Sequence, residues 1–92
     1  MKVSFYATFR PIVGGKVVEF NLPEAATVQQ LIEQIMVQFP DLRQQMLDEA
    51  GRLYTHVHIF INGRDVQYLP LAIETPIGAE DKVDIFPPVA GG

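Results

Sequence analysis

Two histidines, His56 and His58, are the residues whose type and spacing come nearest to a metal site. Side chains two residues apart share one face of a β-strand, so the pair could supply two imidazole ligands. The chain has no cysteine and no third histidine to complete such a site. We therefore interpret the pair as surface histidines at a strand edge, and we expect no bound metal ion.

The carboxylate pairs, the serine and the glycine-rich segment of this sequence each lack a feature that catalysis would require. The carboxylate pairs Asp48-Glu49 and Glu80-Asp81 would need a deep cleft to act as acid and base, and one small core leaves little room for it. Ser4 is the only serine and has no base beside it. Gly14-Gly15-Lys16 resembles part of a phosphate-binding loop but lacks the preceding glycine of that motif. These patterns predict a protein that is not itself an enzyme.

The C-terminal segment 87–92, Pro-Pro-Val-Ala-Gly-Gly, offers a different chemistry, in which the main-chain carboxylate reacts. Two prolines end a strand and stiffen an extended exit from it. The residues after them are uncharged and small, so the tail could thread a narrow channel in another protein, although Gly-Gly alone also fits a frayed end. We predict a folded domain over 1–86 and a tail over 87–92. In that tail Gly92 would react, Gly91 would give clearance, and the guide would be formed by Pro87, Pro88, Val89 and Ala90.

Alternating apolar and polar residues predict most of the strands. Segments 2–9 and 16–22 have this period, and Gly14-Gly15 between them favours a β-hairpin. Segments 57–61 and 83–86 predict two further strands, and Asn62-Gly63 predicts a tight turn. A very short strand is expected within 66–71, and 75–82 is expected to be a loop.

A single main helix is predicted to begin at Thr27, because Thr27 and Gln30 have the spacing of a capping box. Apolar residues follow at helical spacing up to Phe39, and Pro40 ends the helix. A second, short helix is predicted to follow from Asp41, with Gly51 placed to end it.

The order of these elements favours one topology. The first and last strands are both strongly apolar, and pairing them in parallel at the sheet centre would bury both. We therefore predict an α+β protein with the β-grasp (ubiquitin-like) fold, a mixed sheet packed on one main helix, with a flexible C-terminal tail.

Composition excludes several classes of protein. The chain has 92 residues, a net charge of −4 and only seven lysines and arginines, which are scattered, so nucleic acid is not an expected partner. No apolar run approaches the length that spans a bilayer, and the first residues lack the pattern of a signal peptide. We expect a cytoplasmic protein with no membrane partner.

Together these motifs resemble the MoaD/ThiS family of ubiquitin-like sulfur carriers over the whole chain. Segment 2–10 is similar to the first strand of that family, and Thr27-Val28 with Leu31 to its helix start. Segment 58–63 resembles the central strand and turn of the archaeal branch whose members also act as small modifiers. Segment 81–92 resembles the closing signature of the molybdopterin synthase small subunit, with Ala90 in place of the usual serine.

The resemblance implies a set of partners. An ATP-dependent adenylyltransferase of the ubiquitin-activating type would adenylate Gly92, and a sulfur donor would convert it to a thiocarboxylate. The tail would then enter the large catalytic subunit of molybdopterin synthase and donate sulfur for the molybdenum or tungsten cofactor. This chain would bind no cofactor, because ATP and Mg²⁺ are used by the activating partner and the catalytic residues lie on partners.

Three alternatives stay open. The chain could carry sulfur for thiazole, cysteine or tRNA thiolation. It could be a protein modifier joined to lysine through Gly92. It could also be a β-grasp binding module whose tail is irrelevant, in which case deletion of Gly91-Gly92 would leave its function intact.

A partner patch is predicted on the sheet. Phe60 and Phe86 are expected to point away from the helix and to form an exposed apolar surface that also includes His58. Asp81 and Asp84 are expected beside it, where they could meet basic groups of the activating enzyme or serve solubility alone.

Overall fold

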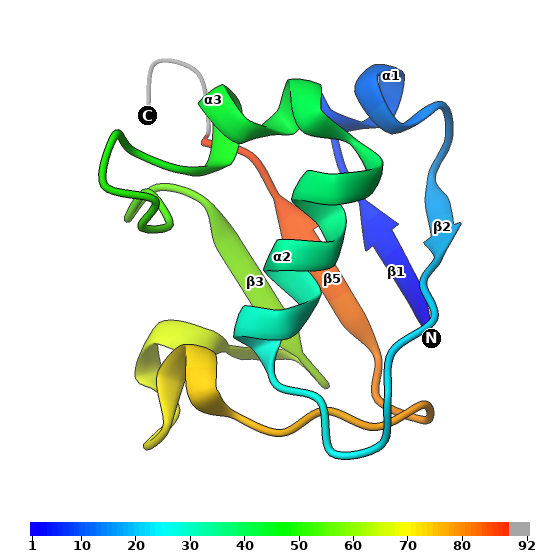
Figure 1. The fold of residues 1–92 in the computed structure, drawn as a ribbon, viewed down its shortest axis with the longest axis vertical. Helices are drawn as coiled ribbons and strands as arrows, with labels where there is room; N and C mark the ends of the chain where they lie inside the picture. Colours follow the sequence, from blue (N-terminus) through cyan, green and yellow to red (C-terminus); the bar gives the residue numbers. More distant parts are fainter. Residues whose placement is uncertain (89–92) are drawn as a thin grey trace.

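A computed structural model describes residues 1–88 and contains a mixed five-stranded sheet with the main helix, α2 (Val28–Gln38), lying across one face (Figure 1). The strand order is β2-β1-β5-β3-β4. The central strands β1 and β5 pair in parallel, with Val3 opposite Val83, and the other neighbours pair antiparallel. This confirms the predicted α+β, β-grasp topology. The strands are β1 (Lys2–Phe5), β2 (Val17–Glu19), β3 (His58–Ile61), β4 (Arg64–Asp65) and β5 (Val83–Phe86).

Helix α2 (Val28–Gln38) begins with the predicted capping box. The N–H of Gln30 donates to Oγ1 of Thr27 at 3.3 Å, and the N–H of Thr27 donates to Oε1 of Gln30 at 2.8 Å. Pro40 starts the 3₁₀ helix η1 (Pro40–Leu42), and α3 (Arg43–Met46) follows it. The short second helix is therefore confirmed, but it ends at Met46, and Gly51 belongs to a later turn in which its φ is 80°.

The first strand is shorter than predicted. The chain leaves the sheet after Phe5, Ala7 has a φ of 50°, and the helix α1 (Phe9–Val13) follows. Phe9 is buried as the first residue of that helix, so its match to the strand period was coincidental. Gly14 ends α1 with a φ of 83°, a conformation that glycine adopts without strain.

The predicted strand within 66–71 is wrong. The Asn62-Gly63 turn forms as expected, with positive φ at both residues, but β4 ends at Asp65. Oδ1 of Asp65 then accepts the N–H of Gln67 at 3.1 Å and caps the 3₁₀ helix η2 (Val66–Tyr68). A further 3₁₀ helix, η3 (Ala72–Glu74), precedes the loop to β5.

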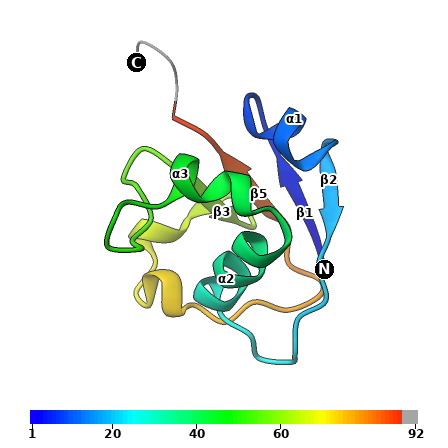
Figure 2. The same cartoon turned by 45° about the horizontal axis from the view of Figure 1, so that its top comes forward.

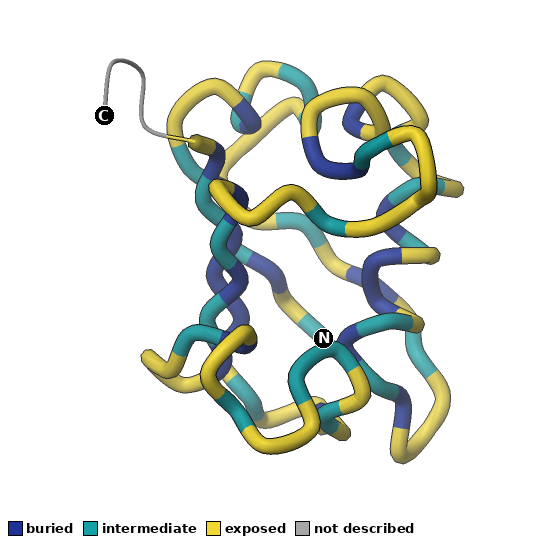
Figure 3. The backbone as a smooth tube through the Cα atoms, turned by 90° about the vertical axis from the view of Figure 1, so that its left-hand side faces the viewer, coloured by how far each residue is buried: buried dark blue, intermediate teal, exposed yellow. Residues whose placement is uncertain are grey.

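The core lies between α2 and the facing side of the sheet. Buried and partly exposed residues alternate along β1 and β3, while the loops at both ends are mostly exposed (Figure 3). No helix among residues 1–88 is long and apolar enough to cross a membrane. The largest fully buried side chains are Phe5, Phe9, Phe20, Leu31, Ile35, Leu42, Met46, Ile59, Ile85, Val3, Val28 and Val83.

Candidate functional site

The root of the C-terminal tail is anchored to the folded body. Phe86 is the last residue of β5, Pro87 is buried, and Pro88 is exposed. Both prolines belong to the predicted tail over 87–92, and the first of them packs against the folded body. The end of β5 lies at the same end of the molecule as α1 (Figure 2). The predicted residues Val89, Ala90, Gly91 and Gly92 lie outside the described residues.

An aromatic patch, defined here as Tyr6, His58, Phe60 and Phe86, lies on the face of the sheet away from α2. The Phe60 ring meets the Phe86 ring edge-on, with centroids 5.4 Å apart and planes at 88°. The Tyr6 ring stacks on the other side of Phe86 at 4.1 Å. The predicted pairing of Phe60 with Phe86 is thus present, and Tyr6 joins it. Tyr6 was not among the residues predicted for this patch, although it follows the buried Phe5 and strand alternation places it on this side.

A hollow of about 520 Å³, here called the exit groove, runs beside the patch where the tail leaves the sheet. Its lining is mostly apolar, and both prolines contribute to it, so the groove and the tail root form one continuous surface. The lining residues are Ala7, Thr8, His58, Phe60, Phe86, Pro87 and Pro88.

Asp84 is not the free surface charge that we predicted. Its side chain faces the patch side of the sheet, but the residue is only 7% exposed. Its Oδ1 accepts a 2.7 Å hydrogen bond from the Tyr6 hydroxyl. The pKa of Tyr6 is raised, mainly by this hydrogen bond and to a smaller extent by burial. The guanidinium carbon of Arg10 lies 5.1 Å from the Tyr6 ring centroid, so a cation also contacts this ring. Asp84 therefore holds Tyr6 in place.

Asp81 is also not beside the patch. It precedes β5, whereas Phe86 ends that strand, so the two residues lie at opposite ends of the sheet. Oδ2 of Asp81 accepts the N–H of Gly78 at 2.7 Å, and its Oδ1 accepts the Asn62 amide at 2.9 Å. Both hydrogen bonds lower the pKa of Asp81, and the bond from Gly78 has the larger effect. Asp81 therefore stabilises a loop on the side away from the tail.

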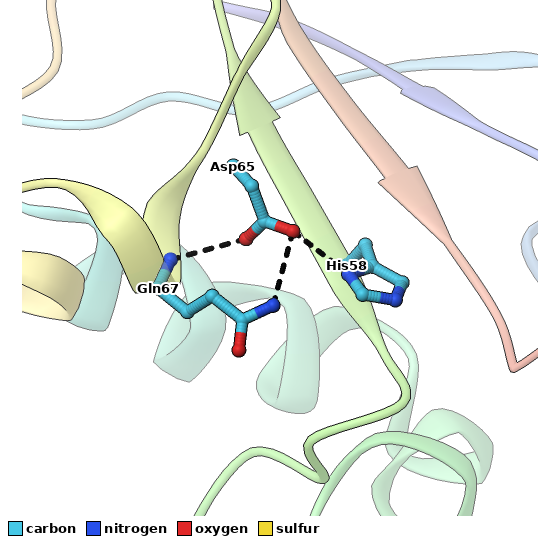
Figure 4. A network of polar contacts seen from close by, with 3 residues as sticks. All are labelled: His58, Asp65 and Gln67. Carbon is cyan, nitrogen blue, oxygen red and sulfur yellow. Dashed lines mark hydrogen bonds and ion pairs between the residues drawn. The ribbon is translucent and has the colours of Figure 1, made fainter.

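His58 takes part in a polar network at the edge of the patch (Figure 4). Its Nδ1 lies 2.8 Å from Oδ2 of Asp65, which also accepts the Gln67 side-chain amide at 3.1 Å. Burial of Asp65 tends to raise its pKa, but the hydrogen bonds from His58 and Gln67 outweigh burial and lower it. The Asp65 carboxylate is therefore ionised at neutral pH.

His56 and His58 do not form one site. His56 is exposed in the loop before β3, and its ring lies parallel to that of Tyr54 with centroids 6.5 Å apart. Within residues 1–88, no three histidine or carboxylate side chains are placed to hold a metal ion together. His56 thus lies outside the strand, whereas His58 is half-buried in β3 and hydrogen-bonded to Asp65.

Known proteins with the same sequence pattern and fold identify the family. The model of the ThiS family matches residues 3–92. Small archaeal modifier protein 3 of Haloferax volcanii is 33% identical over 100% of this chain and 98% of its own length. A candidate sulfur carrier protein of Archaeoglobus fulgidus is 40% identical over 75% of this chain and 77% of its own. A solved structure from Pyrococcus furiosus, described as a candidate molybdopterin converting factor subunit 1, is 32% identical with a TM-score of 0.74, covering 96% of this chain and 95% of that one. The chain therefore belongs to the ThiS family of small ubiquitin-like sulfur carrier and modifier proteins.

Proposed function

We propose that this protein is a sulfur carrier that is adenylated and then thiocarboxylated at Gly92. We further propose that it donates sulfur as the small subunit of molybdopterin synthase. The observation that carries the proposal is the buried Pro87 beside the exit groove. Because the body holds the chain up to Pro87, the residues after it start from a fixed point next to an apolar surface.

The proposed chemistry uses the main chain alone. The Gly92 carboxylate attacks the α-phosphorus of ATP, pyrophosphate leaves, and a mixed acyl–phosphate anhydride forms. Hydrosulfide then attacks the acyl carbon, AMP leaves, and a thiocarboxylate and a proton result. A carboxylate is a poor electrophile and AMP is a good leaving group, so activation must precede sulfur transfer. ATP, Mg²⁺ and the catalytic side chains belong to the partners in this scheme.

The aromatic patch is the proposed docking surface for the activating partner. Phe60 and Phe86 are only partly buried, and aromatic residues carry much of the binding energy of protein interfaces. The exit groove continues from the patch to Pro88, so a partner bound there is placed beside the start of the tail.

The likeness to the Pyrococcus furiosus protein described as a molybdopterin converting factor favours the molybdopterin route. The Pro-Pro-Val-Ala-Gly-Gly ending favours it as well. A second function is favoured by the likeness to small archaeal modifier protein 3, which extends over the whole chain. As a modifier, the same activated Gly92 would be attacked by a lysine amine, and an isopeptide bond would replace the thiocarboxylate.

The experiment incubates the purified chain with an adenylyltransferase of the ubiquitin-activating type, ATP, Mg²⁺ and sulfide. The intact mass is then measured. We expect one oxygen to be replaced by sulfur, and no change in a chain that lacks Gly91-Gly92. Gly15→Ala is the matched control, because no atom outside Gly15 and its two chain neighbours lies within 4 Å of the added methyl group. Adding the large subunit of molybdopterin synthase and the pterin precursor should restore the original mass.

Two results would count against this proposal. If the mass stays unchanged with every adenylyltransferase of the host organism, the carrier function is wrong. If the thiocarboxylate forms but the large subunit does not consume it, the molybdopterin route is wrong. In that case covalent adducts at lysines in cell extract would support the modifier function.

A further inference from the structure

The turn between β3 and β4 contains two neighbouring residues that can react with each other. In an Asn-Gly pair no side chain shields the glycine nitrogen, so this nitrogen can attack the asparagine side chain. Asn62-Gly63 is such a pair, and both residues are exposed to solvent. The other asparagine, Asn21, precedes Leu22, whose side chain hinders the same attack. Asn62 is therefore the residue of this chain most prone to spontaneous deamidation.

The reaction needs no enzyme, and water is its only co-reactant. The Gly63 nitrogen bonds to the side-chain carbonyl carbon of Asn62, and the amide group leaves as ammonia after taking up the Gly63 amide proton. Water then opens the cyclic imide at one of its carbonyl carbons, which yields aspartate or isoaspartate. Ring closure therefore requires the Asn62 side chain to turn back toward the main chain of Gly63.

In the folded chain the Asn62 side chain is bonded to the loop before β5 instead. Its Nδ2 donates to Oδ1 of Asp81 at 2.9 Å, and its Oδ1 accepts the main-chain N–H of Lys82 at 2.9 Å. The main-chain N–H of Asn62 also donates to the carbonyl of Lys82, at 2.8 Å. Both polar atoms of the side-chain amide are thus held by a segment that is distant in sequence.

Asp81 is itself fixed in this position. Its Oδ2 accepts the N–H of Gly78 at 2.7 Å, and the bonds from Gly78 and Asn62 lower its pKa, so the carboxylate is ionised at neutral pH. An ionised carboxylate only accepts hydrogen bonds, so it must face the amide nitrogen of Asn62. The amide oxygen then faces the Lys82 N–H, and this one orientation of the side chain satisfies both contacts.

We infer that Asn62 is a deamidation site whose reaction the fold suppresses through the hydrogen bonds of its side chain with Asp81 and Lys82. Ring closure must break both bonds, so the site reacts only when the loop over 78–82 opens locally. Asp81 is the protecting residue that a substitution can remove, because Lys82 contributes only its main chain. The inference is independent of the proposed function.

The products of deamidation cannot restore these contacts. A carboxylate at position 62 would lie against the ionised carboxylate of Asp81 in place of a hydrogen bond, and like charges repel at this distance. Isoaspartate would also lengthen the main chain within the turn that pairs Ile61 with Arg64. Deamidation should therefore loosen the contact between the β3–β4 turn and the loop before β5.

The test follows deamidation of the purified full chain at one fixed pH and temperature, with the mass of the tryptic peptide 53–64 as the readout. We expect the folded wild type to react about tenfold or more slowly than the same chain in guanidinium chloride, because two hydrogen bonds oppose local opening. Folded Asp81→Ala should react several-fold faster than the wild type. Glu80→Ala is the matched control, since Glu80 is an exposed neighbour outside these hydrogen bonds, and it should react at the wild-type rate.

A pair of variants tests the effect of the product. Asn62→Asp should have a lower unfolding free energy than the wild type. Combining Asn62→Asp with Asp81→Asn exchanges donor and acceptor, so the hydrogen bond forms again and most of the loss should be recovered. A double variant as unstable as Asn62→Asp would contradict the role assigned to the contact between residues 62 and 81.

Equal deamidation rates in the folded and the unfolded wild type would overturn the inference. Equal rates in Asp81→Ala and Glu80→Ala would overturn it as well, because the site would then be protected without Asp81. Circular dichroism verifies that each variant is folded. If Asp81→Ala is unfolded, Asp81→Asn replaces it, since it keeps one of the two acceptor oxygens, and a rate equal to that of the control would overturn the inference in the same way.

Discussion

The hydroxyl of Tyr6 donates a 2.7 Å hydrogen bond to Oδ1 of Asp84, and this bond joins the two central parallel segments of the sheet on the side away from α2. Asp84 is 7% exposed, and the Tyr6 ring stacks on Phe86. The bond therefore fixes the ring against which the last residue of β5 packs. A buried carboxylate thus contributes to the shape of the proposed docking surface.

Tyr6→Phe should destabilise the protein by about 1–3 kcal/mol, because it leaves the buried Asp84 carboxylate without its tyrosine donor. Urea unfolding at neutral pH measures the change. Asp84→Asn is the matched variant, since its amide oxygen can still accept from Tyr6, and its cost should be smaller. A Tyr6→Phe variant as stable as the wild type would show that the bond contributes nothing.

The same bond predicts a loss of stability at high pH. The folded-state pKa of Tyr6 is raised above the ordinary value of 10.0. The stabilisation is therefore fully present below that value and is lost as pH rises through the folded-state pKa. Unfolding free energy measured from neutral pH upward should fall above about pH 10 in the wild type, and this part of the fall should be absent in Tyr6→Phe.

Phe60→Asp should abolish binding of the adenylyltransferase while the fold is retained. Phe60 contacts Phe86 edge-on, and truncation of a central aromatic residue typically costs an interface about 2–4 kcal/mol. Val37→Asp is the matched control, because Val37 is 76% exposed on α2, across the molecule from the patch. Calorimetry measures the Kd of the adenylyltransferase for each of the two variants. Unchanged binding of Phe60→Asp would exclude the aromatic patch as the docking surface.

Asp81→Asn should make the unfolding free energy depend less strongly on pH at acid pH. The pKa of Asp81 is lowered from 3.8 by the hydrogen bonds of Gly78 and Asn62, so its contribution is present above that value. The contribution is lost as pH falls through the folded-state pKa. Unfolding free energy measured below about pH 4 should decline less steeply in the variant. The exposed neighbour Glu80, changed to Gln, serves as the comparison, and equal slopes in both variants would contradict this role.

Thr27→Ala should lower the unfolding free energy by about 1 kcal/mol, because the side chain that accepts the Gln30 N–H is lost from the start of α2. Thr27→Ser retains the hydroxyl and should recover most of the loss. Thermal unfolding measures the stability of the wild type, of Thr27→Ala and of Thr27→Ser. A Ser variant as unstable as the Ala variant would mean that the hydroxyl hydrogen bond is not the cause.

The sequence determined the main helix and the faces of the strands. Thr27 and Gln30 specify the start of α2 through local hydrogen bonds, and the period of the apolar residues specifies which sides are buried. The parallel pairing of β1 with β5 also followed from sequence, since both strands are too apolar for a sheet edge. Phe60 and Phe86 were found because alternation places them on the face opposite Ile59 and Ile85.

Only the tertiary structure decided what the charged residues do. Alternation placed Asp84 on the outer face but could not reveal that Tyr6, 78 residues earlier in the chain, would cover it. The same limit applies to His58 and Asp65, whose contact depends on the turn at Asn62-Gly63 bringing β4 back along β3. The burial of Pro87 likewise depends on packing and not on local propensity. Periodicity reports which face a residue occupies, whereas hydrogen bonds across strands depend on residues that are distant in sequence and meet only after folding.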